Sequence, residues 1–204
     1  MKAHILLSLV LLINGPVRNH CPAGIESIPG SKHKITVDSQ WELKKDKKGV
    51  RVYSQWITIN NATRTRRMKA MLRINASSQQ VVDLLRDASM IKEWMMGAKE
   101  SYALKPGSSG EWAAYTYFSL PWPFDDQDFV ASYMLSNAGN RQTIIKISSR
   151  PELVPRFGHA ERINTFEGIW SLIKLSDNQT LVEYTVYSDT KPKAPLWVQD
   201  PIVL

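Results

Sequence analysis

The segment from Trp112 to Leu135 constrains the fold more than any other part of the chain. Two aromatic-rich runs in it alternate between apolar and polar residues, which is the pattern of β-strands. Between the runs lies an acidic turn that contains Pro121 and Pro123. Proline cannot donate a hydrogen bond to a strand ladder, so the pairing must open there. The segment therefore predicts an antiparallel hairpin whose loop carries Trp122 and Phe124.

Similar patterns predict a meander of strands elsewhere in the chain. A charged turn that ends at Gly49 separates two runs and predicts a hairpin after Trp41. In the strand expected over 64–74, apolar and basic residues alternate, so we expect its basic face to be wet. Further strands are expected over 99–105, 143–149, 162–175 and 180–188. Together these strands predict one antiparallel sheet.

Two helical regions interrupt or end this series of strands. Ser77 followed by Gln80 is a capping-box signature, and apolar residues recur behind it at helical spacing. A second short turn of helix is expected over Met90 to Met95. Near the C-terminus Pro195 suits a first helical position, so a helix should begin near Ala194. The predicted fold class is α+β, with a helix pair inserted between strands and a C-terminal helix.

Basic residues dominate the charge of the chain. The 26 Lys and Arg against 19 Asp and Glu give a net charge of +7, and the excess gathers at 44–48, 64–69 and 191–193. We interpret these clusters mainly as a solvated hairpin tip and the polar face of a strand. The alternative interpretation is that these clusters make a transient contact with an anionic membrane surface. No nucleic-acid-binding motif accompanies the charge, so we expect no nucleic-acid partner.

The N-terminal 23 residues look like a targeting segment. The apolar run Ile5–Ile13 follows Lys2, is too short to span a membrane and matches a secretory signal peptide. We therefore expect an exported protein, periplasmic or secreted. The alternative is an uncleaved anchor that tethers the chain to a membrane. Residues 24–40 are rich in Pro and Gly and are expected to be a linker, which leaves 41–204 as one domain.

Residues that commonly carry catalysis or bind metals are sparse. Cys21 is the only cysteine, which excludes an intramolecular disulfide and a thiolate metal site. His159 is the only histidine in the expected domain. We interpret Asp125, Asp126 and Asp128 as turn-forming residues that are solvated at a strand end, and not as a cation site. We therefore expect no catalytic residue, no metal and no cofactor.

Five motifs follow one another in an order that is typical of a known family. They are Gly49–Tyr53, Leu84–Trp94, Pro121–Val130, Arg162–Trp170 and Ser188–Trp197. With these motifs the chain resembles the StAR-related lipid-transfer (START) domain over residues 41–204. The resemblance implies a helix-grip fold, in which a curved antiparallel sheet surrounds a C-terminal helix and a central cavity.

Two departures from the family pattern are visible. Gln127 stands where the family usually has an arginine, which in several members reaches a buried polar partner in the cavity. The terminal helix expected from Ala194 is also short, and we interpret the chain as truncated within it. In the family that helix forms one wall of the cavity.

The resemblance implies a non-catalytic, monomeric carrier of one hydrophobic molecule, such as a lipid, a sterol or a related polycyclic compound. Five aromatic residues are expected to line or border the cavity, because they fall on strands that the meander brings onto one concave face. They are Tyr115, Tyr117, Phe129, Trp170 and Tyr184. Plain core packing is the alternative role for each of them.

A cavity that admits a lipid also needs a removable wall. We expect Trp122 and Phe124 to pack toward Leu196 and Trp197 as a gate over the cavity mouth. A staple that only fixes the terminal helix to the sheet is the alternative. Two rival functions also stay open. One is an aromatase/cyclase-like enzyme, which should show an inward Arg, His or carboxylate. The other is an exported interaction module whose cavity is filled by side chains.

Overall fold

A computed structural model describes residues 32–104, 110–122, 124–156 and 158–188. Its strands are β1 (Ile35–Val37), β2 (Glu42–Lys47), β3 (Val50–Ile59), β4 (Thr63–Ile74), β5 (Ala98–Ala103), β6 (Glu111–Phe118), β7 (Gln127–Asn137), β8 (Gln142–Ser149), β9 (Glu161–Arg162), β10 (Phe166–Ser176) and β11 (Gln179–Ser188). Its helices are α2 (Ser78–Arg86), α3 (Ile91–Trp94) and the 3₁₀ turns η1 (Ala88–Met90) and η2 (Pro151–Leu153). None of the helices in these ranges is long and apolar enough to cross a membrane. The expected signal segment over 1–23 and the expected terminal helix lie outside the described residues.

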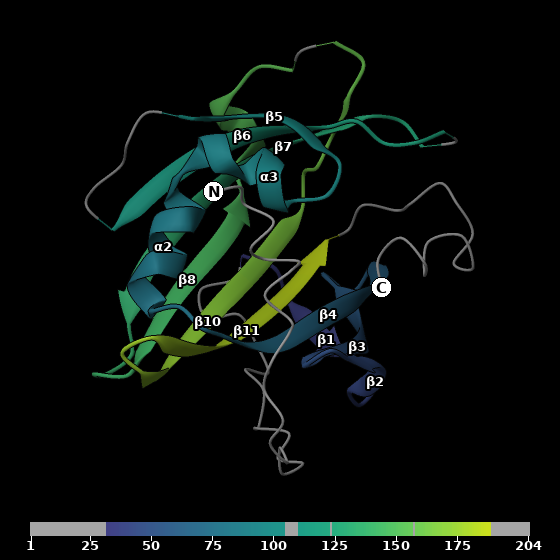
Figure 1. Cartoon of the computed structure of the whole chain (residues 1–204). Coiled ribbons are helices and arrows are strands. Elements are labelled where there is room, and N and C mark those ends of the chain that lie inside the picture. The colour runs from purple at the N-terminus through teal and green to yellow at the C-terminus, as the bar shows by residue number, and fades with distance from the viewer. Residues whose placement is uncertain (1–31, 105–109, 123, 157, 189–204) are drawn as a thin grey trace.

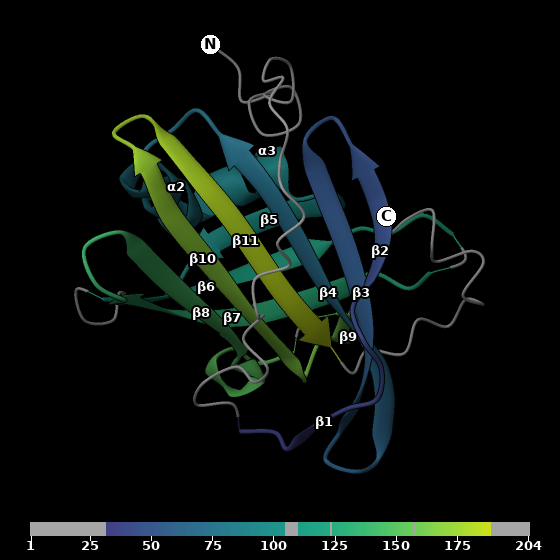
Figure 2. The same cartoon turned by 90° about the horizontal axis from the view of Figure 1, so that it is seen from below.

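The strands form one sheet in the order β1-β3-β4-β11-β10-β8-β7-β6-β5 (Figure 1). Off this path, β2 pairs with the edge of β3, and β9 pairs in parallel with β7. Figure 2 shows β5, β6 and β7 crossing behind β4, β10 and β11, so the sheet bends back on itself. The α2–α3 pair is inserted between β4 and β5. The predicted α+β class, with a curved antiparallel sheet and an inserted helix pair, is confirmed.

The predicted hairpin over Trp112 to Leu135 is formed by β6 and β7, which are joined along their length by antiparallel pairing. Asp126 closes its loop, because its carboxylate accepts hydrogen bonds from the Tyr117 hydroxyl at 2.5 Å and from the Leu120 backbone N–H at 3.0 Å. The bond to Tyr117 holds the pKa of Asp126 below its usual range and raises the pKa of Tyr117. The loop is thus fixed at its base on both sides.

The predicted capping box starts helix α2. The Ser77 hydroxyl accepts from the Gln80 backbone N–H at 3.2 Å, and the Gln80 side chain accepts from the Ser77 backbone N–H at 2.9 Å. The two helices and the sheet then share one main core. Its buried members include Val81, Val82, Leu85, Ala88 and Ile91 from the helical region and Ala131, Ile145, Leu172 and Val182 from the strands.

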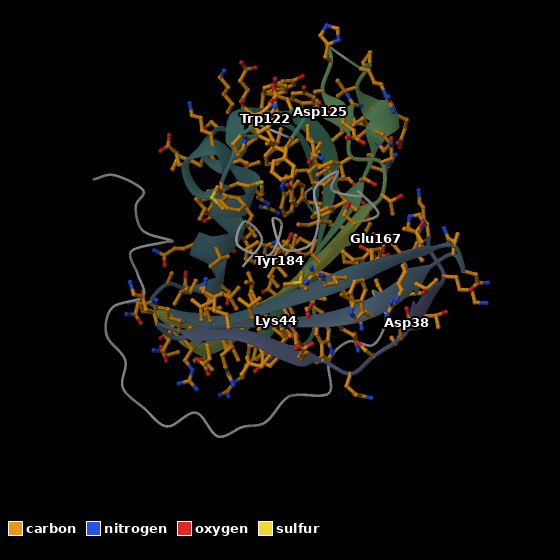
Figure 3. The ribbon with its side chains drawn as sticks, turned by 90° about the vertical axis from the view of Figure 1, so that its right-hand side faces the viewer. Asp38, Lys44, Trp122, Asp125, Glu167 and Tyr184 are labelled. Carbon is orange, nitrogen blue, oxygen red and sulfur yellow. The ribbon has the colours of Figure 1, made fainter. Side chains whose placement is uncertain are left out.

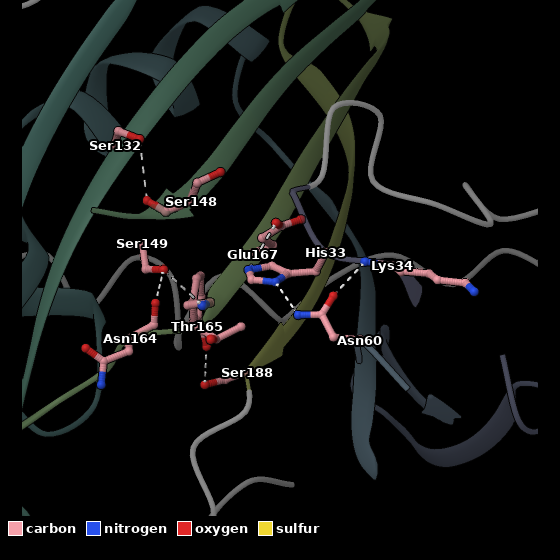
Figure 4. A network of polar contacts seen from close by, with 11 residues as sticks. His33, Lys34, Asn60, Ser132, Ser148, Ser149, Asn164, Thr165, Glu167 and Ser188 are labelled. Carbon is pink, nitrogen blue, oxygen red and sulfur yellow. Dashed lines mark hydrogen bonds and ion pairs between the residues drawn. The ribbon is translucent and has the colours of Figure 1, made fainter. Parts of the chain in front are cut away.

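The expected linker over 24–40 contributes a strand, since β1 pairs with β3. Asn60, in the turn after β3, accepts a hydrogen bond from the Lys34 backbone N–H at 2.9 Å. The same side-chain amide lies 3.1 Å from Nδ1 of His33 (Figure 4). The folded domain therefore begins before Trp41. A strand of three residues is too short to produce a recognisable alternation in the sequence.

Arg162 lies on the short strand β9, so the single strand expected over 162–175 is divided in two. Its Nε and Nη2 donate to the two carboxylate oxygens of Asp128 at 2.6 and 2.7 Å. Both side chains are fully buried, and the expectation that Asp128 is solvated is wrong. The guanidinium also donates to the carbonyls of Pro151 and Val154 at 2.8 and 2.9 Å. These extra bonds offset part of the desolvation cost of the two charges.

The basic residues on the outer face of β4 are less exposed to solvent than the sequence predicts. Arg67 and Lys69 were expected to face water but are only 2% and 1% exposed. The Trp41 ring lies over both cations, with its centroid 5.1 Å from Cζ of Arg67 and 4.4 Å from Nζ of Lys69. Gln55 on β3 accepts a hydrogen bond from Nε of Arg67 at 3.2 Å. The prediction of a wet face is wrong at these two positions, because an aromatic ring and an amide replace the water.

Candidate ligand-binding site

The inner face of the sheet is the face on which α2 and α3 pack. Trp170 on β10 and Tyr184 on β11 are directly opposite each other on this face, and their rings stack with centroids 4.3 Å apart. Trp94, the last residue of α3, meets Trp170 edge-on at 6.4 Å. Figure 3 places Tyr184 between strand β2, which carries Lys44, and the loop that carries Trp122. We call Trp94, Trp170 and Tyr184 the aromatic strip.

Gly168 allows the aromatic strip to continue along β10. A Cβ atom at this position would lie 3.3 Å from the Tyr184 ring and 3.5 Å from the Phe166 ring. Phe166 in turn packs against Phe129 of β7, with ring centroids 4.6 Å apart. The absence of a side chain at Gly168 therefore lets two aromatic rings approach the same stretch of backbone, and it joins the aromatic strip to β7.

Strand β4 extends the inner face on the other side of Tyr184. Ala70 is the register partner of Tyr184, and Met68 and Leu72 flank it at the alternate positions of the same strand. These three apolar side chains are only half-buried, as are Trp170 and Tyr184. The inner face thus has a fully buried part under the helices and an apolar part that is not fully covered by the described residues. The second part is the candidate binding surface.

The structure brings together three of the five residues that were expected to line a cavity. Phe129, Trp170 and Tyr184 all belong to the main core on the inner face. Tyr115 and Tyr117 lie on the opposite face of β6, in a separate cluster, so their expected place on the shared concave face is wrong. The register explains this, because Phe129 pairs with Thr116 and so shares a face with even-numbered residues of β6.

Tyr115 packs instead against the buried ion pair on the outer side of the hairpin. Burial, and then the nearby charge of Asp128, raise the pKa of Tyr115 to about 12. Its ring stacks on Tyr102 of β5, with centroids 4.9 Å apart. These contacts give Tyr115 a structural role in the described fold.

The structure describes two of the four residues that were expected to form the gate. Trp122 is 92% exposed at the tip of the loop, and Phe124 is half-buried. Leu196 and Trp197 lie outside the described residues, so the contact between the loop and a terminal helix stays a prediction.

Trp94 is an inner-face residue that was not among the five residues expected to line the cavity. Its indole N–H is buried and has no hydrogen-bond partner among the described residues. Two phenols share this face. Burial raises the pKa of Tyr133 to about 12, and burial together with Tyr133 raises that of Tyr184. Both phenols therefore stay neutral at physiological pH, and the inner face offers uncharged hydrogen-bond donors among apolar rings.

No protein-family model matches the chain. The uncharacterised protein PA1579 of Pseudomonas aeruginosa is 23% identical over 164 residues, which cover 80% of this chain and 79% of that protein. The crystal structure of a STAR-related lipid transfer protein from Xanthomonas axonopodis superposes with a TM-score of 0.70 and 26% identity, over 80% of this chain and 89% of that one. The chain therefore has the fold of a START domain.

A human protein supports the same fold at lower sequence similarity. Human StAR-related lipid transfer protein 5 superposes with a TM-score of 0.64 at 12% identity, over 80% of this chain and 78% of that one. At this level of identity the comparison concerns the fold alone. The features that support this fold are the strand order and the helix pair inserted between β4 and β5, and both lie within the described residues.

Proposed function

We propose that this protein is a non-catalytic carrier that binds a hydrophobic molecule, such as a lipid, a sterol or a related polycyclic compound, on the inner face of its sheet. The proposal is supported by the fold and by the names of the two solved neighbours above, which describe lipid-transfer proteins. Export through residues 1–23, a monomeric state and contact with a membrane stay predictions.

The observation that carries the proposal is the apolar surface around Tyr184. The stacked Trp170 and Tyr184 rings, together with Met68, Ala70 and Leu72 of β4, are half-buried on a face that is otherwise core. Covering roughly 300 Å² of apolar ligand surface there would contribute about 7 kcal/mol at ~25 cal/mol per Å². Part of that free energy would be offset by the entropy lost on association. Apolar contact alone is therefore sufficient for a useful affinity.

The cyclase-like alternative was expected to show an inward Arg, His or carboxylate, and acid–base catalysis further requires that this group can exchange a proton with the substrate. On β3, β4, β8, β10 and β11, which surround the aromatic strip, the inner positions include no histidine and no carboxylate. Arg64 and Arg66 do take inner positions, but an arginine side chain does not give up its proton in a protein. The inner face of these strands is thus better suited to binding than to acid–base chemistry.

Identification of the bound molecule tests the proposal. The full chain would be purified without detergent, extracted with organic solvent and the extract analysed by mass spectrometry. A hydrophobic compound in stoichiometric amount, absent from a control protein purified in the same way, is the expected result. An empty extract, combined with no binding to a panel of phospholipids, sterols and fatty acids, would overturn the proposal.

A further inference from the structure

Polar groups on several aromatic rings of the inner face have no hydrogen-bond partner in the described part of the chain. The indole N–H of Trp94 is one of them, and neither the Tyr133 nor the Tyr184 hydroxyl makes a hydrogen bond with another described residue. The Tyr117 hydroxyl on the outer side of the hairpin, by contrast, donates to Asp126. The inner face therefore presents donors that the described protein groups do not use.

The two hydroxyls differ from the Trp94 N–H in their access to space outside the protein. Of these three groups, only the Trp94 nitrogen is enclosed on all sides, and both phenol oxygens keep some accessible surface. Tyr184 as a whole is half-buried, and its ring stacks on Trp170 within the candidate binding surface. The Tyr184 hydroxyl is therefore open to a molecule that occupies that surface.

The two hydroxyls share an environment that is poor in water. Burial raises the pKa of both phenols, and the neighbouring Tyr133 raises the pKa of Tyr184 further. Stacking holds both rings in place, because Tyr133 lies against Trp112 with ring centroids 5.0 Å apart and Tyr184 lies against Trp170. A ligand atom beside Tyr184 thus meets neutral O–H donors on rings that are already fixed.

An unused phenol in such a place is unfavourable. A hydroxyl that is removed from water without an acceptor loses hydrogen bonds that it makes in the unfolded chain, and a phenylalanine of the same shape would avoid this loss. A tyrosine at position 184 becomes favourable when a bound molecule supplies the acceptor. The hydroxyl of Tyr184 is therefore better explained by a ligand than by the stability of the fold.

The acceptor that suits this position is an uncharged oxygen. A phenol can donate to a carbonyl, ester, ether or hydroxyl oxygen. A carboxylate or phosphate beside Tyr184 would lose its hydration and find no cation on β10 or β11, the strands that carry the stacked rings. The one basic residue at an inner position of these two strands is Lys174, at the far end of β10, and its Nζ already lies 2.6 Å from Oδ1 of Asp177.

We propose that the ligand carries a neutral hydrogen-bond acceptor, such as a ketone, an ester or a hydroxyl group, on its hydrocarbon body, and that the Tyr184 hydroxyl donates to this acceptor. Tyr133 supplies a second donor in the same environment. The inference narrows the ligand from any hydrophobic molecule to an oxygenated, uncharged one, and it makes Tyr184 a residue that determines specificity. It rests on the proposed function, because it concerns the same ligand and the same face.

Equilibrium dialysis of the full chain with three matched naphthalenes tests this inference. 2-Acetylnaphthalene has a ketone oxygen, 2-ethylnaphthalene has nearly the same shape without an oxygen, and 2-naphthoate is an anion. We expect Tyr184→Phe to weaken binding of 2-acetylnaphthalene about three- to tenfold, which is the range for one neutral hydrogen bond, and to leave 2-ethylnaphthalene unchanged. In the wild type, 2-naphthoate should bind at least about tenfold more weakly than 2-acetylnaphthalene.

Tyr102→Phe is the matched control. It removes the same hydroxyl from the outer side of the sheet, where Tyr102 is 45% exposed, and it should change the binding of no probe. Thermal unfolding without ligand separates a ligand contact from a structural role. Tyr184→Phe should keep or raise the Tm, because its hydroxyl has no partner to lose among the described residues. A drop of several degrees would show a structural hydrogen bond and overturn the inference.

The other possible failures are distinguishable. If Tyr184→Phe weakened both neutral probes equally, or neither of them, the role of Tyr184 would be refuted and the hydrophobic carrier would stay intact. Tighter binding of 2-naphthoate than of 2-acetylnaphthalene would refute the preference for an uncharged ligand. Absence of binding by all three probes to the wild type would overturn both the inference and the proposed function.

Discussion

Asp128→Asn is the most informative test of the fold. The substitution keeps the shape of the side chain but removes the charge that faces the Arg162 guanidinium at 2.6 and 2.7 Å, in a site where both residues are fully buried. Removing one partner of a buried ion pair costs about 3–5 kcal/mol, because the other charge stays buried without compensation. For a domain of this size each kcal/mol lowers Tm by about 2–4 °C. The expected loss is therefore about 6–20 °C.

The assay is thermal unfolding followed by circular dichroism, with Asp177→Asn as the matched control. Asp177 also pairs with a cation at 2.6 Å, but it is almost fully exposed, and surface pairs of this kind contribute little. The Tm of the Asp177→Asn variant should therefore stay close to that of the wild type. If Asp128→Asn melted within 1 °C of the wild type, the Asp128–Arg162 pair would not stabilise the fold and the reasoning would be refuted.

Substitutions at three further positions test other parts of the structure by the same assay. Lys69→Met should leave Tm unchanged or raise it by a few degrees, because the buried ammonium has no hydrogen-bond partner among the described residues; a drop of several degrees would contradict this. Gly168→Ala should lower Tm, since its Cβ would lie 3.3 Å from the Tyr184 ring and overpacking costs about 1–3 kcal/mol; an unchanged Tm would show that the ring can move away. Ser77→Ala removes the capping box and should lower Tm by about 2–4 °C, whereas Ser77→Asp should restore it.

Local signals in the sequence predicted the elements of the fold well. The capping box of Ser77 and Gln80 depends on residues three positions apart, and the structure confirms it. The β6–β7 hairpin depends on alternation within each strand and on the prolines between them, and it is also confirmed. Such features need no knowledge of distant parts of the chain, which is why they can be predicted from pattern alone.

The faces of the hairpin could not be predicted in the same way. Alternation divides a strand into two sets of residues, but it does not show which set faces the core when both sets are aromatic. In β6, Trp112 and Phe118 pack on the inner face, and Tyr115 and Tyr117 pack on the outer face. The outer set is covered by Val154, far away in the sequence, and that cover has no local signature.

Buried charges were missed for the same reason. Arg67 and Lys69 read as the polar side of an amphipathic strand, and only the position of Trp41 over them shows that the surface is covered. Asp128 reads as part of an acidic turn, and its partner Arg162 lies 34 residues further along the chain. In each case the decisive contact joins residues that are distant in sequence, so tertiary structure was required to find it.

The central claim, that the inner face binds a hydrophobic molecule, is tested most directly by filling that face. Met68→Trp would place a large side chain on the half-buried apolar surface beside Tyr184, and Met134→Trp makes the same change at an exposed position on the outer face. The amount of hydrophobic compound that copurifies would be measured by solvent extraction and mass spectrometry for the wild type and for both variants. We predict equal amounts in the wild type and Met134→Trp and a loss of at least about tenfold in Met68→Trp, with its Tm within a few degrees of wild type. Equal amounts of bound compound in all three proteins would contradict the claim.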